Sequence, residues 1–332
     1  MAGERLLVVG PSWVGDMVMA QALFKTLAAR FPDADIDVVA PGWSVPVVAR
    51  MPEVRRAVVL ATGHGEFGLG KRRELAASLR SEGYTQAIVL PRSMKAALVP
   101  WFAGIPRRTG FRGEMRFGVV NDIRPFDKSV LDQTVKRFVA LGLPAGERPT
   151  DIPQPVLRVD ETRQRALTES LELPVDKPVV AMMPGAEYGP AKCWPLEHFA
   201  SLARELDARG FNVWLMGSEK DRPAGEAIAS GSSAINLCGR TSLEDVIDVL
   251  AMARHAVSND SGLMHVAAAV GCHVHGIYGS SSPAFTPPLT DRRTIHHLDL
   301  DCSPCFKREC PLGHLDCLKK LDVARVLAPI SV

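Results

Sequence analysis

The chain has 332 residues, of which 46% are hydrophobic and 23% charged, and its formal net charge is +2. This length favours two domains of roughly 150 residues, with enough apolar residues for two large cores. No apolar run reaches the roughly 18 residues that a membrane span needs, and the first residues lack the architecture of a signal peptide, so we expect a cytoplasmic protein. The net charge is too small to imply a nucleic-acid partner, and no nucleic-acid motif is present, so we expect no nucleic acid among the partners.

The first half alternates between buried strands and helices. We expect strands at residues 5–9, 36–39, 54–60 and 85–90, and helices at residues 17–31, 45–50 and 74–82. This alternation is typical of a doubly wound α/β sheet. The G-x-G-x-x-G pattern of dinucleotide-binding proteins is absent after the first strand, where the glycines are Gly10 and Gly15.

Asp16 stands where the first loop becomes a helix, at the carboxyl end of the first predicted strand. Ligands bind at that edge of open α/β sheets. A carboxylate there can cap the helix, which is worth about 1 kcal/mol, or act as a general base. Capping alone does not demand a carboxylate, because Ser or Thr would serve, so Asp16 is our candidate base.

Basic residues are concentrated between Glu66 and Arg116, where they outnumber acidic residues by ten to four, a balance of +6. The ten are Lys71, Arg72, Arg73, Arg80, Arg92, Lys95, Arg107, Arg108, Arg112 and Arg116. Aromatic residues are interleaved with them. Each of these residues alone is typical of a solvated face, but together they favour docking to an anionic ligand or membrane surface.

A proline-rich stretch at residues 143–157 marks the expected domain boundary. We expect a second α/β domain after it. Its strands are predicted at residues 179–183, 213–216 and 274–278, with a further short strand ending at Val257. Its helices are predicted at residues 161–171, 198–209, 243–252 and 263–270.

Three loops of this half follow strand ends, at residues 185–192, 217–221 and 259–262. The carboxyl ends of parallel strands share one edge of a sheet, so we expect these loops to lie together. Lys192 beside glycine and proline is a suitable diphosphate partner, although a lone lysine is usually a solvated surface residue. Asp260, Ser261 and Gly262 begin a helix, where free backbone N–H groups suit a phosphate, or where they form an ordinary cap.

Four of the seven cysteines lie near the carboxyl terminus, as Cys302–x2–Cys305–x4–Cys310–x6–Cys317. Such a cluster indicates zinc before disulfides in a cytosolic protein. The spacing contains only one C-x2-C pair, so reduced cysteines in a compact loop are the favoured interpretation, and zinc stays open.

Four stretches carry a family resemblance: Ser12–Asp16, Pro184–Pro195, Asn259–His265 and the cysteine-rich end. In this order and at these separations, the chain resembles the ADP-heptose:lipopolysaccharide heptosyltransferases, most closely their heptosyltransferase II branch, over nearly its whole length. These are inverting glycosyltransferases of family nine.

The resemblance implies an α/β fold of the GT-B type, with two Rossmann-like doubly wound domains facing across a cleft. The expected domains are residues 1–157, for the acceptor, and residues 158–332, for ADP-heptose, with the final helix at 322–327 packing back on the first domain. It implies transfer of L-glycero-D-manno-heptose to the first heptose of the lipopolysaccharide inner core, on heptosyl-Kdo-lipid A. The enzyme would work without cofactor or metal, in peripheral contact with the cytoplasmic face of the inner membrane.

The resemblance also implies residue roles. Asp16 and Lys192 are the expected catalytic residues, as base and as diphosphate contact. The expected donor contacts are Glu187, Tyr188, Lys192, Asp221, Thr241, Asp260, Ser261, Gly262, Leu263 and His265. The expected acceptor contacts are Trp13, Lys95, Arg107, Arg108 and Arg112. Related enzymes carry hydroxyl residues where Glu187 and Tyr188 stand here, so that contact differs in detail.

Three alternatives remain open from the sequence. Heptosyltransferase I, acting on Kdo-lipid A, shares these motifs. An NAD-dependent oxidoreductase also has two α/β halves, although the missing glycine fingerprint counts against it. A non-catalytic sugar-nucleotide or lipid-binding protein would tolerate loss of Asp16.

Overall fold

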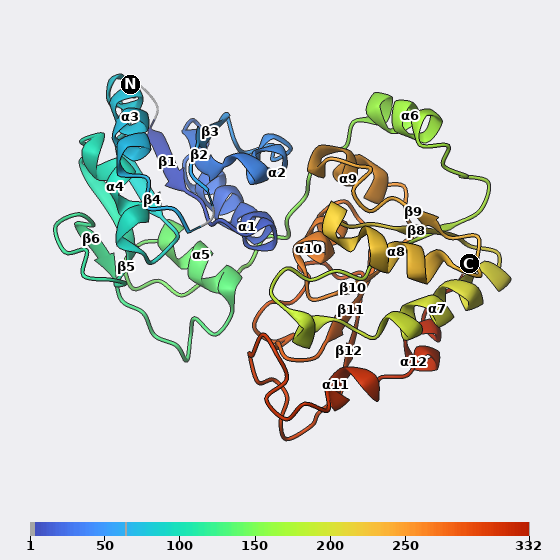
Figure 1. The fold of residues 1–332 in the computed structure, drawn as a ribbon. Helices are drawn as coiled ribbons and strands as arrows, with labels where there is room; N and C mark the ends of the chain where they lie inside the picture. Colours follow the sequence, from blue (N-terminus) through green and yellow to red (C-terminus); the bar gives the residue numbers. More distant parts are fainter. Residues whose placement is uncertain (1–3, 64, 332) are drawn as a thin grey trace. The chain divides into compact units, whose positions relative to one another are not determined.

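The computed structural model describes residues 4–63 and 65–331. Its contacts divide the chain into two compact units, Met1–Pro155 and Val156–Val332. Each unit is built on one six-stranded sheet flanked by helices (Figure 1). No described helix combines the length and apolar character that a membrane span requires.

The sheet of the first unit has the strand order β3-β2-β1-β4-β5-β6, and all its strands are parallel. This is a doubly wound order: β2 and β3 are added on one side of β1, and β4, β5 and β6 are added on the other side. The strands are β1 (Arg5–Val9), β2 (Asp35–Pro41), β3 (Arg56–Leu60), β4 (Gln86–Val89), β5 (Arg107–Phe111) and β6 (Asp122–Arg124). The helices are α1 (Val14–Arg30), α2 (Val45–Ala49), α3 (Leu69–Leu79), α4 (Met94–Phe102) and α5 (Thr134–Gly142), with short 3₁₀ turns η1 (Gly42–Ser44) and η2 (Arg80–Glu82).

Helices pack in pairs on this sheet. Helices α1 and α5 contact each other, and α3 packs against α4. Side chains of β1, β2, β3, α3 and α4 bury one shared apolar cluster, which includes Leu7, Val39, Leu79 and Val99. Burying such side chains is the main favourable term that holds a helix on a sheet. At the carboxyl ends of the strands lie the loops that border the cavity described below.

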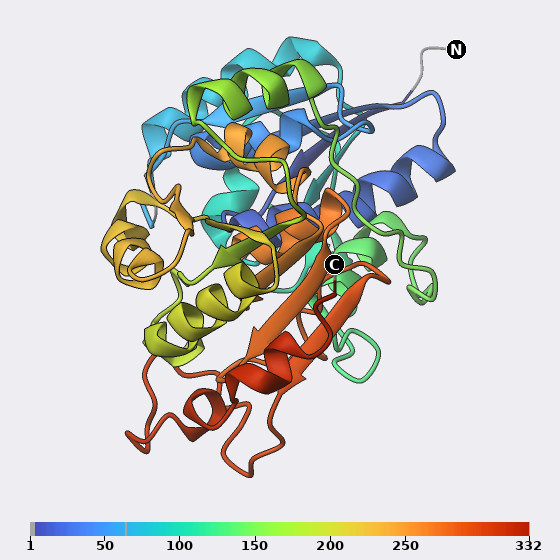
Figure 2. The same ribbon diagram turned by 90° about the vertical axis from the view of Figure 1, so that its right-hand side faces the viewer.

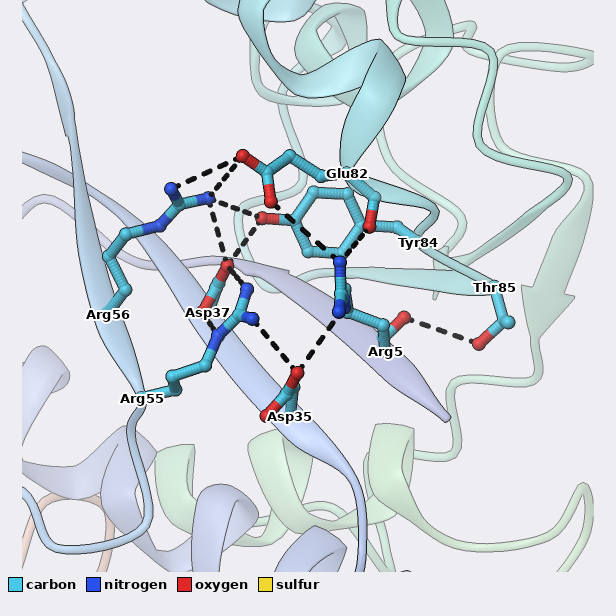
Figure 3. Close-up of polar contacts among 8 residues, drawn as sticks. All are labelled: Arg5, Asp35, Asp37, Arg55, Arg56, Glu82, Tyr84 and Thr85. Atoms are coloured by element: carbon cyan, nitrogen blue, oxygen red, sulfur yellow. Dashed lines mark hydrogen bonds and ion pairs between the residues drawn. The ribbon is translucent and has the colours of Figure 1, made fainter. Parts of the chain in front are cut away.

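A buried ionic network holds the opposite edge of this sheet, near the start of β2 (Figure 3). Asp37 is fully buried, and it accepts hydrogen bonds from Arg55 at 2.9 Å and from the Tyr84 hydroxyl at 2.6 Å. Arg56 also reaches Asp37, at 3.2 Å. Burial acts to raise the pKa of Asp37, but the bonds from Arg55 and Tyr84 outweigh it and hold the pKa below its ordinary value. The network ties β3 and the start of β4 to β2.

The sheet of the second unit has the order β12-β11-β10-β7-β8-β9, again all parallel, so it repeats the topology of the first. The strands are β7 (Val179–Met183), β8 (Asn212–Leu215), β9 (Ile235–Asn236), β10 (His255–Asn259), β11 (His273–Tyr278) and β12 (Arg293–His297). The helices are α6 (Glu161–Ser170), α7 (Leu196–Ala208), α8 (Arg222–Ala229), α9 (Leu243–Leu250), α10 (Gly262–Ala269), α11 (Asp316–Lys319) and α12 (Val323–Leu327), with 3₁₀ turns η3 (Pro190–Lys192) and η4 (Glu219–Asp221). The predicted doubly wound α/β class is therefore confirmed in both halves.

The final helix belongs to the core of the second unit. Helix α12 packs on α7 (Figure 1). Val326 and Leu327 are buried in the apolar cluster of α7 and β7, and the Trp194 indole donates a hydrogen bond to the Leu321 carbonyl at 2.8 Å. Figure 2 shows the terminal red helices beside the orange strands of this sheet. The helix is short, and its apolar side chains are buried against α7 in the same unit.

Candidate active site

A cavity of about 480 Å³ opens at the carboxyl edge of the first sheet. It is lined by the loop after β1, including Trp13, and by the loop after β4, including Ser93. Strands β1 and β4 are neighbours, and the strands that follow each of them lie on opposite sides of the sheet. Such a place is called a topological switch point, and ligands bind in the crevice there. The topology therefore creates this cavity between two loops that are far apart in the sequence.

Asp16 lines this cavity from the first turn of α1. The N-cap position of that helix is occupied by Trp13, so Asp16 is not the N-cap residue. The side chain is half-buried. The structure thus places a carboxylate at the wall of a large cavity, where it can reach a hydroxyl of a bound molecule.

Basic side chains dominate the charged lining of the cavity. They are Arg72, Arg92, Lys95 and Arg137, against the carboxylates Asp16 and Glu66. Arg92 and Arg137 both lie over the ring of Phe126, at 4.7 and 5.2 Å from its centre. Burial lowers the pKa of Arg137, yet a guanidinium keeps its charge at neutral pH. The cavity is therefore suited to an anionic molecule. Arg137 follows the basic cluster in sequence and carried no motif signal.

The remaining predicted acceptor residues lie elsewhere. Arg107, Arg108 and Arg112 do not line the cavity. The guanidinium of Arg108 donates to the carbonyls of Val119 and Gly118, and Arg107 pairs with Asp122 at 3.1 Å. The basic cluster is thus divided between the cavity and other contacts.

Two members of the basic cluster are buried, so the ten basic residues do not all belong to one docking surface. Arg72 and Arg116 are 4% and 2% exposed. Arg72 donates to the Phe67 carbonyl at 2.7 Å, and Arg116 donates to the Phe111 carbonyl at the same distance. Guanidinium groups satisfy carbonyls that irregular loops leave unpaired, and composition cannot reveal this use.

In the second unit, Lys192 and Asp260 meet across the corresponding switch point, between the loops after β7 and β10. The Lys192 ammonium lies 2.5 Å from a carboxylate oxygen of Asp260. Both are largely buried, at 17% and 5% exposure. An ion pair in such a place is strongly held, because removing one partner leaves a buried charge. The two residues that the sequence singled out are therefore in direct contact.

Tyr188 flanks this pair. The Lys192 ammonium lies 5.0 Å from the centre of the Tyr188 ring, within cation–π distance. The Tyr188 hydroxyl donates to the Phe306 carbonyl at 2.9 Å. Glu187 instead pairs with the exposed Lys220 at 3.1 Å. Of the two residues that replace the family's hydroxyls, Tyr188 positions Lys192, while Glu187 lies in an exposed ion pair.

The first turn of α10 supplies Ser261, Gly262, Leu263 and His265. Ser261 is the N-cap residue but forms no side-chain cap hydrogen bond; its hydroxyl lies 3.2 Å from that of Ser258. The first N–H groups of the helix are therefore not capped by Ser261. Burial lowers the pKa of His265 to about 4, so the imidazole is neutral at neutral pH.

Asp221 and Thr241 follow β8 and β9 at the same edge of the sheet. Asp221 accepts hydrogen bonds from the backbone and the hydroxyl of Ser218, at 2.8 and 2.7 Å. A Cβ at Gly185 would collide with the Asp221 carboxylate, so a larger residue there would displace this side chain. The Thr241 hydroxyl is buried without a hydrogen-bond partner among the described residues, which leaves it available to a ligand.

Asn259 is a positioning residue that sequence reasoning did not assign. It is fully buried at the end of β10. Its side chain donates to the Pro184 carbonyl at 2.6 Å and accepts from the Trp194 N–H at 3.0 Å. It therefore fixes both ends of the Lys192 loop to β10. Its place beside Asp260 in the motif was the only available signal.

The loop that carries Cys302 to Cys317 supports the Lys192 loop from outside. The Arg308 carbonyl accepts a hydrogen bond from the Ala191 N–H at 3.0 Å, and Phe306 donates to the Ser280 carbonyl at 2.6 Å. Backbone N–H groups that face Cys310 lower the pKa of its thiol. Burial raises the pKa of Cys317 to about 11.

Comparison with known proteins agrees with this geometry. Residues 72–316 match the family model described as glycosyltransferase family 9 (heptosyltransferase). Lipopolysaccharide heptosyltransferase 2 of Escherichia coli (strain K12) is 43% identical over 98% of this chain and 97% of that protein. Lipopolysaccharide heptosyltransferase 1 of Pseudomonas aeruginosa is 25% identical over 92% of this chain and 87% of that protein.

A solved structure matches as well. The structure of Escherichia coli ADP-heptose lps heptosyltransferase II aligns with a TM-score of 0.88 and 42% identity, over 98% of this chain and 96% of that chain. The resemblance drawn from the motifs is thus confirmed, and the oxidoreductase and the non-catalytic binding protein are set aside. The chain belongs to glycosyltransferase family 9, the heptosyltransferases, and is a glycosyltransferase.

Proposed function

We propose that the protein transfers L-glycero-D-manno-heptose from ADP-heptose to the first heptose of the lipopolysaccharide inner core, with inversion. The observation that carries this proposal is the Asp16 carboxylate at the wall of a large cavity lined mainly by basic side chains. The much higher identity to a heptosyltransferase 2 than to a heptosyltransferase 1 supports the second heptose addition over the first.

Asp16 is the proposed general base. Its carboxylate takes the proton of the acceptor hydroxyl, whose oxygen attacks the anomeric carbon of the donor heptose. The bond from that carbon to the diphosphate oxygen breaks, and ADP leaves with the electron pair. A single displacement of this kind inverts the anomeric centre, and a positioned base contributes roughly 10²–10⁴-fold to such a step.

Lys192 and the N-terminus of α10 are the proposed diphosphate site. The ammonium and the first helix amides supply positive charge where negative charge develops on the leaving group. Asp260 already neutralises Lys192, so the diphosphate competes with this carboxylate for the ammonium. We assign Asp260 to the heptose hydroxyls, since like charges keep it from the phosphates. Thr241, with its unpartnered hydroxyl, and the neutral His265 are further donor contacts.

The basic lining of the cavity is the proposed acceptor site. Lys95 and Trp13 belong to it, with Arg92 and Arg137, and together they favour an acceptor that carries phosphates and carboxylates. We place the enzyme at the cytoplasmic face of the inner membrane, where basic side chains gain about 1 kcal/mol each near an anionic surface.

The acceptor assignment is tested with two paired variants. Replacing Arg92 and Lys95 with Gln removes two charges from the cavity, so the KM for acceptor is expected to rise and its salt dependence to flatten. Replacing Arg107 and Arg112 with Gln removes two charges outside the cavity and serves as the control. Equal effects of the two pairs on acceptor KM would contradict an acceptor site in the cavity.

The function as a whole is tested by transfer assays with ADP-heptose. Purified protein is offered Kdo-lipid A and heptosyl-Kdo-lipid A separately, and the products are mapped by mass spectrometry. We expect one heptose to be added to heptosyl-Kdo-lipid A. Preference for Kdo-lipid A would replace the proposal with the first heptose addition.

A further inference from the structure

The segment of residues 298–315 runs between β12 and α11 without helix or strand. Segments longer than about 12–15 residues without secondary structure are uncommon inside a compact unit, and something must hold them in place. This segment, with the first turn of α11, contains four of the seven cysteines of the chain: Cys302, Cys305, Cys310 and Cys317. We call it the cysteine loop.

All four cysteines line one small hollow of about 20 Å³. They are free thiols; Cys317 is buried and the other three are half-buried. A hollow of this size holds about one water-sized sphere, and hence also a single metal ion. Cysteines spread over the whole loop thus border the same hollow.

Apolar packing explains only the two ends of the cysteine loop. Leu298, Leu300 and Leu315 are partly buried against the core of the second unit. In the middle of the loop, the large apolar side chains are exposed, Phe306 at 51% and Leu312 at 61%. The hydrophobic effect therefore does not hold the middle of the loop, which carries three of the four cysteines that border the hollow.

The chain turns tightly between Cys310 and Cys317. The Gly313 N–H donates a hydrogen bond to the Cys310 carbonyl at 3.1 Å. Leu315 adopts a left-handed backbone, with φ of 59°, which is uncommon for a residue other than glycine. Cys310 and Cys317, on either side of this turn, border the same hollow.

We propose that Cys302, Cys305, Cys310 and Cys317 bind one divalent metal ion in tetrahedral coordination. Four thiolates select zinc or iron(II) over magnesium and calcium. His314 is not a ligand at Nδ1, because that nitrogen accepts the Asp316 N–H at 3.0 Å. Among the described residues, no three His, Cys, Asp or Glu side chains are already placed to hold an ion. Binding therefore requires the thiols to turn further into the hollow, with release of their protons.

The ion would brace the donor site, and this part rests on the proposed function. The hollow is also lined by Ala191, which precedes Lys192. The cysteine loop holds the Lys192 loop through Arg308 and through the Tyr188 hydroxyl. Fixing four points of the cysteine loop would hold Tyr188 and Lys192 in the geometry that receives the diphosphate.

Elemental analysis tests the site itself. Protein purified under reducing conditions, without chelator, is expected to contain about one zinc or iron ion per chain, as four ligands for one tetrahedral ion require. Cys310→Ser and Cys317→Ser should lose this metal. Cys272→Ser is the control and should retain the metal, because Cys272 lies outside the loop and its thiol donates to the Leu250 carbonyl. Wild-type protein stripped of metal and refilled with Co²⁺ should show the intense visible absorption of tetrahedral cobalt thiolate, a readout that does not depend on the folding of variants.

The proposal is overturned if reduced wild-type protein, incubated with excess Zn²⁺ or Fe²⁺ and then desalted, binds neither ion. It is equally overturned if denatured protein shows the four sulfurs paired as disulfides. The bracing role is measured separately, by ADP titration of stripped and metal-filled protein. Stripped protein should bind ADP several-fold more weakly, and equal affinities would refute the bracing role.

Discussion

At the scale of single residues, Asp16 is distinguished by its surroundings. It lies at the first turn of α1 and shares the cavity with a second carboxylate, Glu66. Glu66 accepts the Gly63 N–H at 2.7 Å and pairs with Lys71 at 2.9 Å. Those bonds hold Glu66 as an anion and lower its pKa, since the backbone bond from Gly63 and the bond from Lys71 both favour the charged form. A carboxylate held in this way is a weak base, which argues against Glu66 as the proton acceptor.

Asp16→Asn is expected to reduce kcat by roughly 10²–10⁴-fold, because the amide keeps the shape of the side chain but cannot take a proton. Donor affinity should be nearly unchanged, since the donor contacts lie in the second unit. The measurement is steady-state transfer, with ADP binding by calorimetry. Glu66→Gln is the matched control and should retain most of the turnover. Near-normal kcat in Asp16→Asn would remove Asp16 from the mechanism.

At the scale of elements, the donor site depends on loops that are fixed to one another. Asn259 joins the loop after β7 to β10, and Asp260 holds Lys192 on the same side. Lys192 is thus not a flexible surface side chain. Its ammonium is held before the donor arrives, so less side-chain entropy is lost on binding.

Lys192→Ala is expected to weaken ADP-heptose binding by about 1.5–3 kcal/mol, the scale of a hydrogen bond to a charged group. The same change leaves Asp260 without its cation, so the variant should also unfold more easily. Adding Asp260→Asn should restore stability without restoring affinity, which separates the two effects. Lys220→Ala, on the exposed ion pair with Glu187, is the control in calorimetry and thermal unfolding. Equal donor affinity in Lys192→Ala and wild type would reject the assignment.

At the scale of the molecule, a set of buried histidines makes stability depend on pH. Three of them, His255, His275 and His296, form a row across β10, β11 and β12 together with the half-buried His273. The His255 and His275 rings are joined by a 3.1 Å hydrogen bond, and His255 also contacts the Ser331 carbonyl. Burial lowers the pKa of His275 to about 2 and that of His296 to about 4, with smaller contributions from neighbouring charged groups.

We therefore expect stability to fall as the pH is lowered below about 6.5, the ordinary histidine pKa. The folded pKa values lie below the unfolded value, so the unfolded chain binds more protons between pH 6.5 and 4. Each such histidine contributes on the order of 1 kcal/mol per pH unit in that window. Urea unfolding from pH 7.5 to 4.5 measures the slope. His275→Gln should reduce the slope by about one proton relative to wild type, and an unchanged slope would contradict this origin.

The sequence determined the class of the fold and the location of the catalytic candidates. Strands Arg5–Val9 and Val179–Met183 occur at the predicted residues, because continuous apolar runs ended by glycine or proline are typical of buried parallel strands. Two polar strands on one side of the first sheet were missed: β5 begins with Arg107 and Arg108, and the edge strand β6 is only the three residues Asp122–Arg124. Asp16, Lys192 and Asp260 were found because each follows a predicted strand at the edge where ligands bind.

Only the tertiary structure decided which of these residues meet. Pairing of Lys192 with Asp260 requires β7 and β10 to be neighbours. The order of strands in a sheet cannot be predicted from the spacing of apolar residues along the chain. The use of arginines also depends on the fold: Arg116 is buried on carbonyls and does not line the cavity, whereas Arg92 and Arg137 line the cavity while each donates to a carbonyl. The sequence gives the number of cations, but burial decides which of them face a cavity, because a buried donor must satisfy its neighbours.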